Sequence, residues 1–162
     1  MRLALYQPDI PQNTGTILRM AACLDVTVEI VGPAGFDISG RALRRAGLDY
    51  IDAVGLIRHS SFADFEAARR AAGRRLILMT TRAATPYTRF RFLPGDTLMA
   101  GRESAGVPEA VHDAADARVL IPMKPGLRSL NVAVAAAIVL GEALRQTGRF
   151  PDGGTGAEGS DP

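Results

Sequence analysis

Three segments of the chain combine glycine or proline with side chains that bind anions or move protons, and each follows a short apolar run. The first extends from Pro8 to Arg19, is stiffened by two prolines, and contains Asn13 and Gly15. A helix that begins near Asn13 would present free backbone N–H groups to an anion. Arg19 follows Gly15 by roughly one helical turn, and its guanidinium can bind phosphate or carboxylate in a bidentate way. By itself, a rigid strand–helix turn with a solvated arginine explains this segment equally well.

The second segment extends from Met99 to Pro108 and places Gly101 and Gly106 on either side of Glu103. Glycines directly after a strand indicate that the backbone approaches something closely. An ordinary turn followed by a helix cap would give the same pattern. The segment therefore predicts a close approach without saying what is approached.

The third segment extends from Ile121 to Asn131 and is stiffened by proline and glycine before a long apolar helix begins. Either Ser129 or Asn131 can cap that helix. A buried helix N-terminus leaves N–H groups that need a partner, and a bound ligand is one such partner.

Several common kinds of site lack their motifs in this sequence. There is no G-x-G-x-x-G after a strand, no phosphate-binding P-loop, no H-E-x-x-H and no G-x-S-x-G. With a single cysteine, the chain forms no internal disulfide and no multi-cysteine zinc site. We expect no bound metal, we expect His59 and His112 to be surface residues, and we expect Cys23 to be a buried, small apolar residue.

Short apolar runs alternate with helical patterns along the chain. The predicted strands are 3–6, 26–31, 53–57, 76–80, 97–100 and 118–121, and the predicted helices are 13–24, 60–72, 108–114 and 130–147. The strands are apolar on both faces, as buried parallel strands are. This order predicts an α/β fold with a mostly parallel sheet and helices on both faces.

Length and composition indicate one globular domain over residues 1–150 and a disordered polar tail over 151–162. No segment resembles a signal peptide or a membrane span, so we expect a cytoplasmic protein. Without the tail, 19 basic residues face 14 acidic ones, and 18 of the 19 are arginine. This balance permits a nucleic-acid partner, although a GC-rich genome also favours arginine over lysine.

Taken together and in this order, the three segments resemble the signature motifs of the SPOUT (trefoil-knot) RNA methyltransferases. The first is similar to N-x-G-x-x-x-R, the second to G-x-E-x-x-G-x-P and the third to I-P-M…S-L-N. The resemblance covers residues 1–149. A further stretch, Arg41 to Tyr50, is similar to one typical of the TrmL-type branch, which methylates the wobble nucleotide of certain tRNAs.

The resemblance implies a trefoil knot near the C-terminus and S-adenosyl-L-methionine as the methyl-donating co-substrate. The residues at the family's donor-binding positions, with their neighbours, are Met79, Met99, Gly101, Ile121, Met123, Ser129, Leu130 and Asn131. Arg19 matches the family's catalytic arginine, and Asn13 and Glu103 are the expected supports that orient it. Arg102 departs from the family pattern, because a smaller or neutral residue is expected inside the second motif.

The implied reaction is methylation of the ribose 2′-hydroxyl of the tRNA wobble nucleotide, either a cytidine or a modified uridine. The implied enzyme is a homodimer in which Arg19 of one chain completes the site of the other, and the apolar first and last helices favour a dimer independently. We expect Arg41, Arg44, Arg45 and Arg128 to hold the anticodon arm, with Tyr50 and Tyr87 as stacking candidates. The alternatives are a ribosomal RNA 2′-O-methyltransferase and a non-catalytic RNA-binding module that retains the fold.

Overall fold

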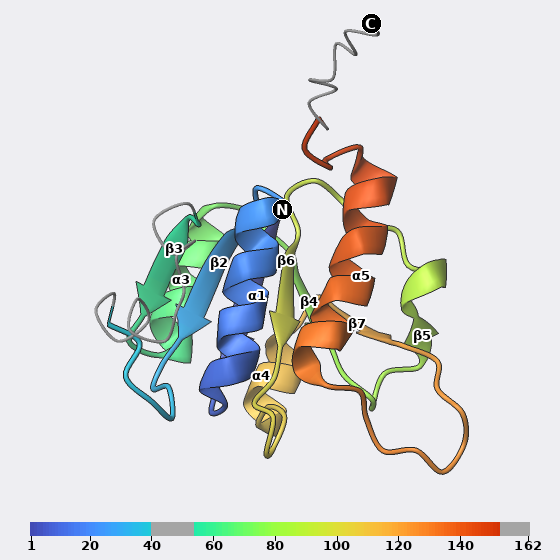
Figure 1. Ribbon diagram of the computed structural model, residues 1–162, viewed down its shortest axis with the longest axis horizontal. Coiled ribbons are helices and arrows are strands. Elements are labelled where there is room, and N and C mark those ends of the chain that lie inside the picture. The colour runs from blue at the N-terminus through green and yellow to red at the C-terminus, as the bar shows by residue number, and fades with distance from the viewer. Residues whose placement is uncertain (40–53, 153–162) are drawn as a thin grey trace, which may run out of the picture.

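A seven-stranded sheet forms the centre of the molecule, with strand order β3-β2-β1-β6-β4-β7-β5 (Figure 1). The computed structural model describes residues 1–39 and 54–152. Within these residues every pair of neighbouring strands is parallel. The strands are β1 (Arg2–Tyr6), β2 (Thr27–Val31), β3 (Leu56–His59), β4 (Leu76–Met79), β5 (Thr85–Pro86), β6 (Thr97–Ala100) and β7 (Ala117–Leu120). The predicted α/β architecture is therefore confirmed.

Two strands differ from the prediction in an informative way. β3 lies further along the chain than the apolar run that predicted it, because its pairing with β2 continues through the polar residues Arg58 and His59. β5 was not predicted, since two residues at a sheet edge carry no apolar pattern. The remaining strands match their predicted ranges to within one residue at each end.

Helices cover both faces of the sheet (Figure 1). They are α1 (Pro11–Cys23), α3 (Phe62–Ala71), α4 (Glu109–Ala114) and α5 (Val132–Thr147), with the short 3-10 helix η1 (Tyr87–Arg89). Helices α1 and α5 pack beside one another on one face, over a core that includes Leu3, Leu5 and Leu98. Helices α3 and α4 cover the other face through Phe65 and Val111. Among the described residues, no helix has both the length and the apolar character needed to cross a bilayer.

Helix α1 begins earlier than predicted, at Pro11, with Ile10 in the N-cap position. Proline suits the first helical turn because it lacks an N–H that would otherwise stay unpaired. The prediction that this helix begins at Asn13 is therefore wrong by two residues. The Asn13 side chain is available for contacts outside the helix.

Three predictions about single residues are also wrong. Cys23 is exposed, because it lies about 200° round the helix from the buried Ala21. His59 and His112 are partly buried and have partners. His59 Nε2 lies 2.6 Å from Glu29 Oε2, and His112 Nδ1 accepts a hydrogen bond of 2.9 Å from Arg118 Nε.

Glu29 is a fully buried carboxylate at the centre of a charged network. Its Oε1 accepts hydrogen bonds from Arg2 Nη1 at 3.0 Å and Arg74 Nη2 at 3.1 Å, and its Oε2 contacts His59. These contacts join β1, β2 and β3 to the segment that precedes β4. A buried charge is tolerated when it is paired in this way.

We expect Glu29→Gln to lower the free energy of unfolding by about 3 kcal/mol, because it leaves two partly buried arginines without their anion. For a domain of this length, the melting temperature should fall by roughly 6 to 12 °C. Glu109→Gln is the matched control, since it removes the exposed partner of another arginine, Arg82. Equal melting temperatures for the two variants would show that the Glu29 network contributes no stability.

Candidate functional site

A cavity of about 500 Å³ opens at the carboxyl edge of the sheet. Its walls come from the segments that follow four adjacent strands, β1, β6, β4 and β7, and from the start of α5. In Figure 1 these segments lie at the lower edge of the sheet. The chain that leaves β1 continues to β2 on one side, whereas the chain that leaves the adjacent strand β6 continues to β7 on the other side. Such a switch point is where open α/β sheets bind ligands.

Most of the residues predicted to bind the donor line this cavity. They are Met79, Gly101, Ile121, Met123, Ser129, Leu130 and Asn131. Met99 does not line it. Side chains alternate along a strand, so Met99 of β6 points into the core beneath α3 and α4, where it is fully buried, while Ala100 faces the cavity.

The close approach predicted for the second motif occurs between two parts of the motif itself, the backbone at Gly101 and Arg102 and the backbone at Gly106. Arg102 N donates to Gly106 O at 2.9 Å and Gly106 N donates to Arg102 O at 2.7 Å, which closes a tight loop. A Cβ on Gly101 would lie 2.8 Å from the backbone carbon of Gly106. Gly106 has a φ of +68°, a conformation that side chains disfavour. Both glycines are therefore required by the loop that forms one wall of the cavity.

The three sequence motifs are joined by a chain of hydrogen bonds at the cavity wall. Asn13 Nδ2 donates to Glu103 Oε1 at 3.3 Å, and Asn131 Nδ2 donates to Asn13 Oδ1 at 2.9 Å. Asn131 Oδ1 in turn caps α5 by accepting from Ala133 N at 2.8 Å and Val134 N at 3.3 Å. Of the two predicted caps, the structure uses Asn131. Asn13 and Glu103 are thus brought together, although they are 90 residues apart. Their predicted role in orienting Arg19 stays a prediction.

Asp9 is a contact residue that the sequence prediction missed. Its backbone N donates to Glu103 Oε2 at 3.2 Å, and Glu103 N donates to Asp9 Oδ1 at 3.2 Å. Hydrogen bonding with the side chains of Glu103 and Ser104 lowers the pKa of Asp9 to about 2. Burial, followed by hydrogen bonding with Asp9, raises the pKa of Glu103. The signal available in the sequence was an acidic residue in the short link between Pro8 and Pro11.

Arg19 does not belong to the cavity wall of its own chain. It lies on the exposed side of α1, about 9 Å further along the helix than Asn13 and turned about 120° from it. Arg128 is exposed on the segment between β7 and α5, and Tyr87 is partly buried in η1. Arg41, Arg44, Arg45 and Tyr50 lie outside the described residues.

The cavity has the size and chemistry of a small-molecule site. Its floor is apolar and includes Leu78, Ala100, Val119 and Val139, while its rim carries hydroxyl, amide and carboxylate groups. Ligand pockets commonly combine an apolar slot with a few fixed polar groups. An adenine ring fits the apolar part, and the backbone beside Gly101 lets a ligand approach closely.

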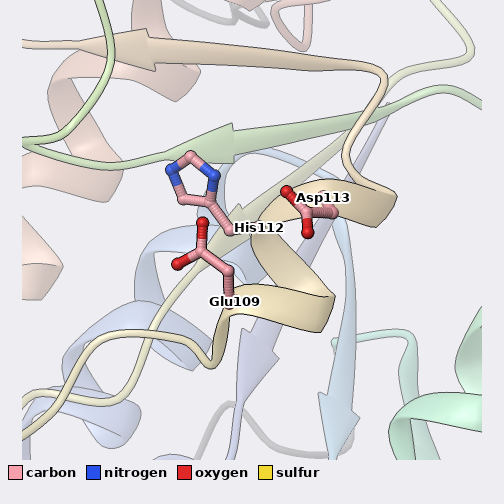
Figure 2. A group of neighbouring side chains, drawn as sticks. All are labelled: Glu109, His112 and Asp113. Carbon is pink, nitrogen blue, oxygen red and sulfur yellow. The ribbon is translucent and has the colours of Figure 1, made fainter.

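A second cluster, on α4, has donor atoms at metal-binding distances. One atom each from Glu109, His112 and Asp113 lies within 4.8 Å of the others, and Figure 2 shows the Glu109 carboxylate beside the His112 ring. However, Arg118 Nε donates to His112 Nδ1, so in a neutral ring Nε2 carries the hydrogen and is not a ligand. Arg82 also binds both oxygens of Glu109, at 2.9 and 3.2 Å. The cluster is therefore better described as a network of ion pairs and hydrogen bonds.

Comparison with known proteins agrees with this geometry. A relative from Beijerinckia indica named tRNA (cytidine(34)-2'-O)-methyltransferase is 65% identical over 146 residues, covering 90% of this chain and 91% of the relative. A solved structure described as "Structural insights into the 2-OH methylation of C/U34 on tRNA" has a TM-score of 0.82 and 43% identity, covering 90% of this chain and 94% of that chain. The SpoU methyltransferase AviRb from Streptomyces viridochromogenes, solved in complex with the cofactor AdoMet, has a TM-score of 0.79 and 30% identity, covering 90% of this chain and 60% of that chain.

The parallel sheet, the cavity at its carboxyl edge and these neighbours define a methyltransferase of the SPOUT class, as the three motifs predicted. The sequence profile of the SpoU rRNA Methylase family matches residues 1–141. The chain belongs to this family.

Proposed function

We propose that this protein transfers a methyl group from S-adenosyl-L-methionine to the ribose 2′-hydroxyl of nucleotide 34, the wobble nucleotide, of tRNA. The observation that carries the proposal is the hydrogen-bonded chain Glu103–Asn13–Asn131, which unites all three motifs at one cavity. The relatives that match most of the chain carry this activity in their names.

The donor would occupy the cavity between the motif segments. When bound, the donor would supply a methyl group attached to a positively charged sulfur. Once the C–S bond to that methyl group breaks, the rest of the donor leaves as a neutral thioether. The residues proposed to hold it are Met79, Gly101, Ile121, Met123, Ser129, Leu130 and Asn131. The AdoMet-bound structure of a family relative supports S-adenosyl-L-methionine as the donor. The proposed chemistry requires no metal.

The chain's own residues have to position the ribose oxygen and take up its proton. We assign Arg19 to the target nucleotide, where its permanently charged guanidinium can bind the ribose or phosphate and stabilise developing negative charge on oxygen. Since a guanidinium is a poor base, the proton leaves through the phosphate or through water. Asn13 and Glu103 fix the polar wall that faces this nucleotide.

The same proposal includes a homodimer in which Arg19 of one chain completes the cavity of its partner. It is supported by the exposed position of Arg19 and by large apolar side chains exposed near the cavity mouth, including Ile10 at 40%, Leu130 at 39% and Val134 at 49%. Exposed apolar groups that cluster in this way are typical of an interface.

Other parts of the sequence prediction also stay predictions. They are the trefoil knot, a single domain over 1–150, the cytoplasmic location, and binding of the anticodon arm by Arg41, Arg44, Arg45 and Arg128. Methylation of ribosomal RNA is the second candidate function, because the matching family is described by that activity. We rank it lower, since the 65% identical relative is named for tRNA.

The test is to incubate the protein with labelled donor and either unmodified total tRNA or ribosomal RNA, and to map the product by mass spectrometry. We expect 2′-O-methylation at nucleotide 34 of a subset of tRNAs. Modification of ribosomal RNA alone would favour the second candidate. An absence of transfer to both RNAs, together with no donor binding by calorimetry, would overturn the proposal in favour of an RNA-binding relative.

A further inference from the structure

We propose that Asp9 is a positioning residue for methyl transfer, which locks the loop from Arg102 to Gly106 onto the start of α1 and aims the Glu103 carboxylate at Asn13. This inference rests on the proposed function. Asp9 does not line the cavity, so it acts through Glu103 rather than on the substrate.

The two acidic residues hold one another through their backbones. Each backbone N–H donates to the side chain of the other residue, and both distances are 3.2 Å. A reciprocal pair of this kind fixes both the position of the loop and the rotation of the carboxylate. With Oε2 of Glu103 held by Asp9, Oε1 is the oxygen that accepts from Asn13 Nδ2.

The other carboxylate oxygen of Asp9 holds the residues on either side of Glu103. Ser104 Oγ donates to Asp9 Oδ2, and Arg102 Nε lies 3.5 Å from the same oxygen. Three consecutive loop residues therefore converge on one side chain. These contacts tie the loop to a segment more than 90 residues away in the sequence.

The backbone around Asp9 is itself constrained. Gln7 has a φ of 43°, an unusual conformation for a residue other than glycine, and it turns the chain out of β1 toward Asp9. On the other side, a Cβ on Gly35 would lie 3.1 Å from Asp9 Cα, and Gly35 N donates to Pro8 O at 2.9 Å. Asp9 is thus held from two directions, as a residue that orients another should be.

The contacts also shift the pKa values of the two carboxyl groups in opposite directions. Glu103 faces the Asp9 carboxylate from the β1–α1 segment and the Asn13 amide from α1. The Arg102 guanidinium of the same loop lies beside the Asp9 carboxylate. The pKa of Asp9 is lowered and that of Glu103 is raised, so on acidification Glu103 takes up the proton first. Removing the Asp9 charge should therefore lower the pKa of Glu103 and let it stay ionised to a lower pH.

The test compares Asp9→Asn, Glu103→Gln and the double variant. We expect Asp9→Asn to lower kcat about tenfold, within the range that a lost orienting contact costs. Its donor affinity should stay near that of the wild type, and the acidic limb of its kcat–pH profile should move to lower pH. In the Glu103→Gln background, Asp9→Asn should lower kcat little further, because the effect of Asp9 on kcat passes through Glu103. Asp25→Asn, which removes an exposed carboxylate at the far end of α1, is the matched control and should match the wild type.

A second measurement does not depend on activity. Carbon-13 NMR of labelled glutamate carboxyls should show a lower pKa for Glu103 in Asp9→Asn than in the wild type. If Asp9→Asn does not fold, Asp9→Ser removes the same charge with a smaller side chain and should shift the Glu103 titration in the same direction. An unchanged titration, or an equal loss of rate in both backgrounds, would overturn the role of Asp9. A wild-type chain that methylates no RNA would instead overturn the proposed function, while the NMR comparison would still decide whether Asp9 controls Glu103.

Discussion

Replacing Arg19 with alanine is expected to lower the rate of methyl transfer to tRNA by at least about 100-fold while donor binding stays unchanged. The reason is its location. Arg19 lies on the exposed side of α1 and not in the wall of its own chain's cavity, so truncating it leaves the donor site intact. What disappears is the cation that would hold the target nucleotide. Single-turnover transfer and calorimetry with the donor measure the two effects separately.

Two further variants make this result specific. Arg19→Lys keeps the charge but loses the planar, bidentate geometry, so we expect it to recover only a small part of the rate. Arg70→Ala removes another exposed helical arginine, on α3, and should behave as the wild type. If Arg19→Ala lost donor affinity and rate in equal measure, the residue would have a structural role and the catalytic assignment would be wrong.

The sequence predicted the fold well because its strands are short apolar runs buried on both faces. Such runs, separated by helical patterns, leave few arrangements other than a parallel sheet covered on both sides. β6 illustrates this, since every residue from Thr97 to Ala100 is buried and the predicted range was correct. The prediction failed where pairing rather than hydrophobicity sets the bounds, as in β5 and in the polar end of β3.

For the site, the motifs located the segments but not the direction of each side chain. Met99 and Gly101 both belong to the second motif, yet only Gly101 reaches the cavity. Strand alternation turns Met99 to the face opposite Ala100, whereas Gly101 lies beyond the end of β6, in the loop that forms one wall of the cavity. The register of β6 against its neighbours decides this, and the sequence does not state that register.

Contacts between distant segments were the least predictable feature. Asp9 carries no motif of its own, and its importance appears only when the Arg102–Gly106 loop folds against it. The buried network of Glu29 and His59 is similar, since a glutamate inside an apolar strand finds its partners only through the order of the strands. Polar residues of this kind depend on tertiary pairing and not on local pattern.

We expect Gly101→Val to weaken donor binding by about 100-fold. A Cβ at this position would lie 2.8 Å from a backbone carbon of Gly106, which cannot rotate away as a flexible side chain would. The loop must therefore shift into the cavity or open. Overpacking of this kind costs up to about 3 kcal/mol, and each 1.4 kcal/mol corresponds to a tenfold change in affinity. Calorimetric titration with S-adenosyl-L-methionine measures the loss directly.

Gly95→Val is the matched control, because Gly95 has no atom within 4 Å of its added Cβ, and it should bind donor as the wild type does.

Arg19→Ala and Gly101→Val then test the dimer together, since each removes a different half of the proposed shared site. If Arg19 serves the partner's cavity, each mixed dimer has one intact site, and mixing equal amounts should restore about a quarter of the wild-type rate. A mixture that stays inactive although mixed dimers form would show that each chain builds its site alone.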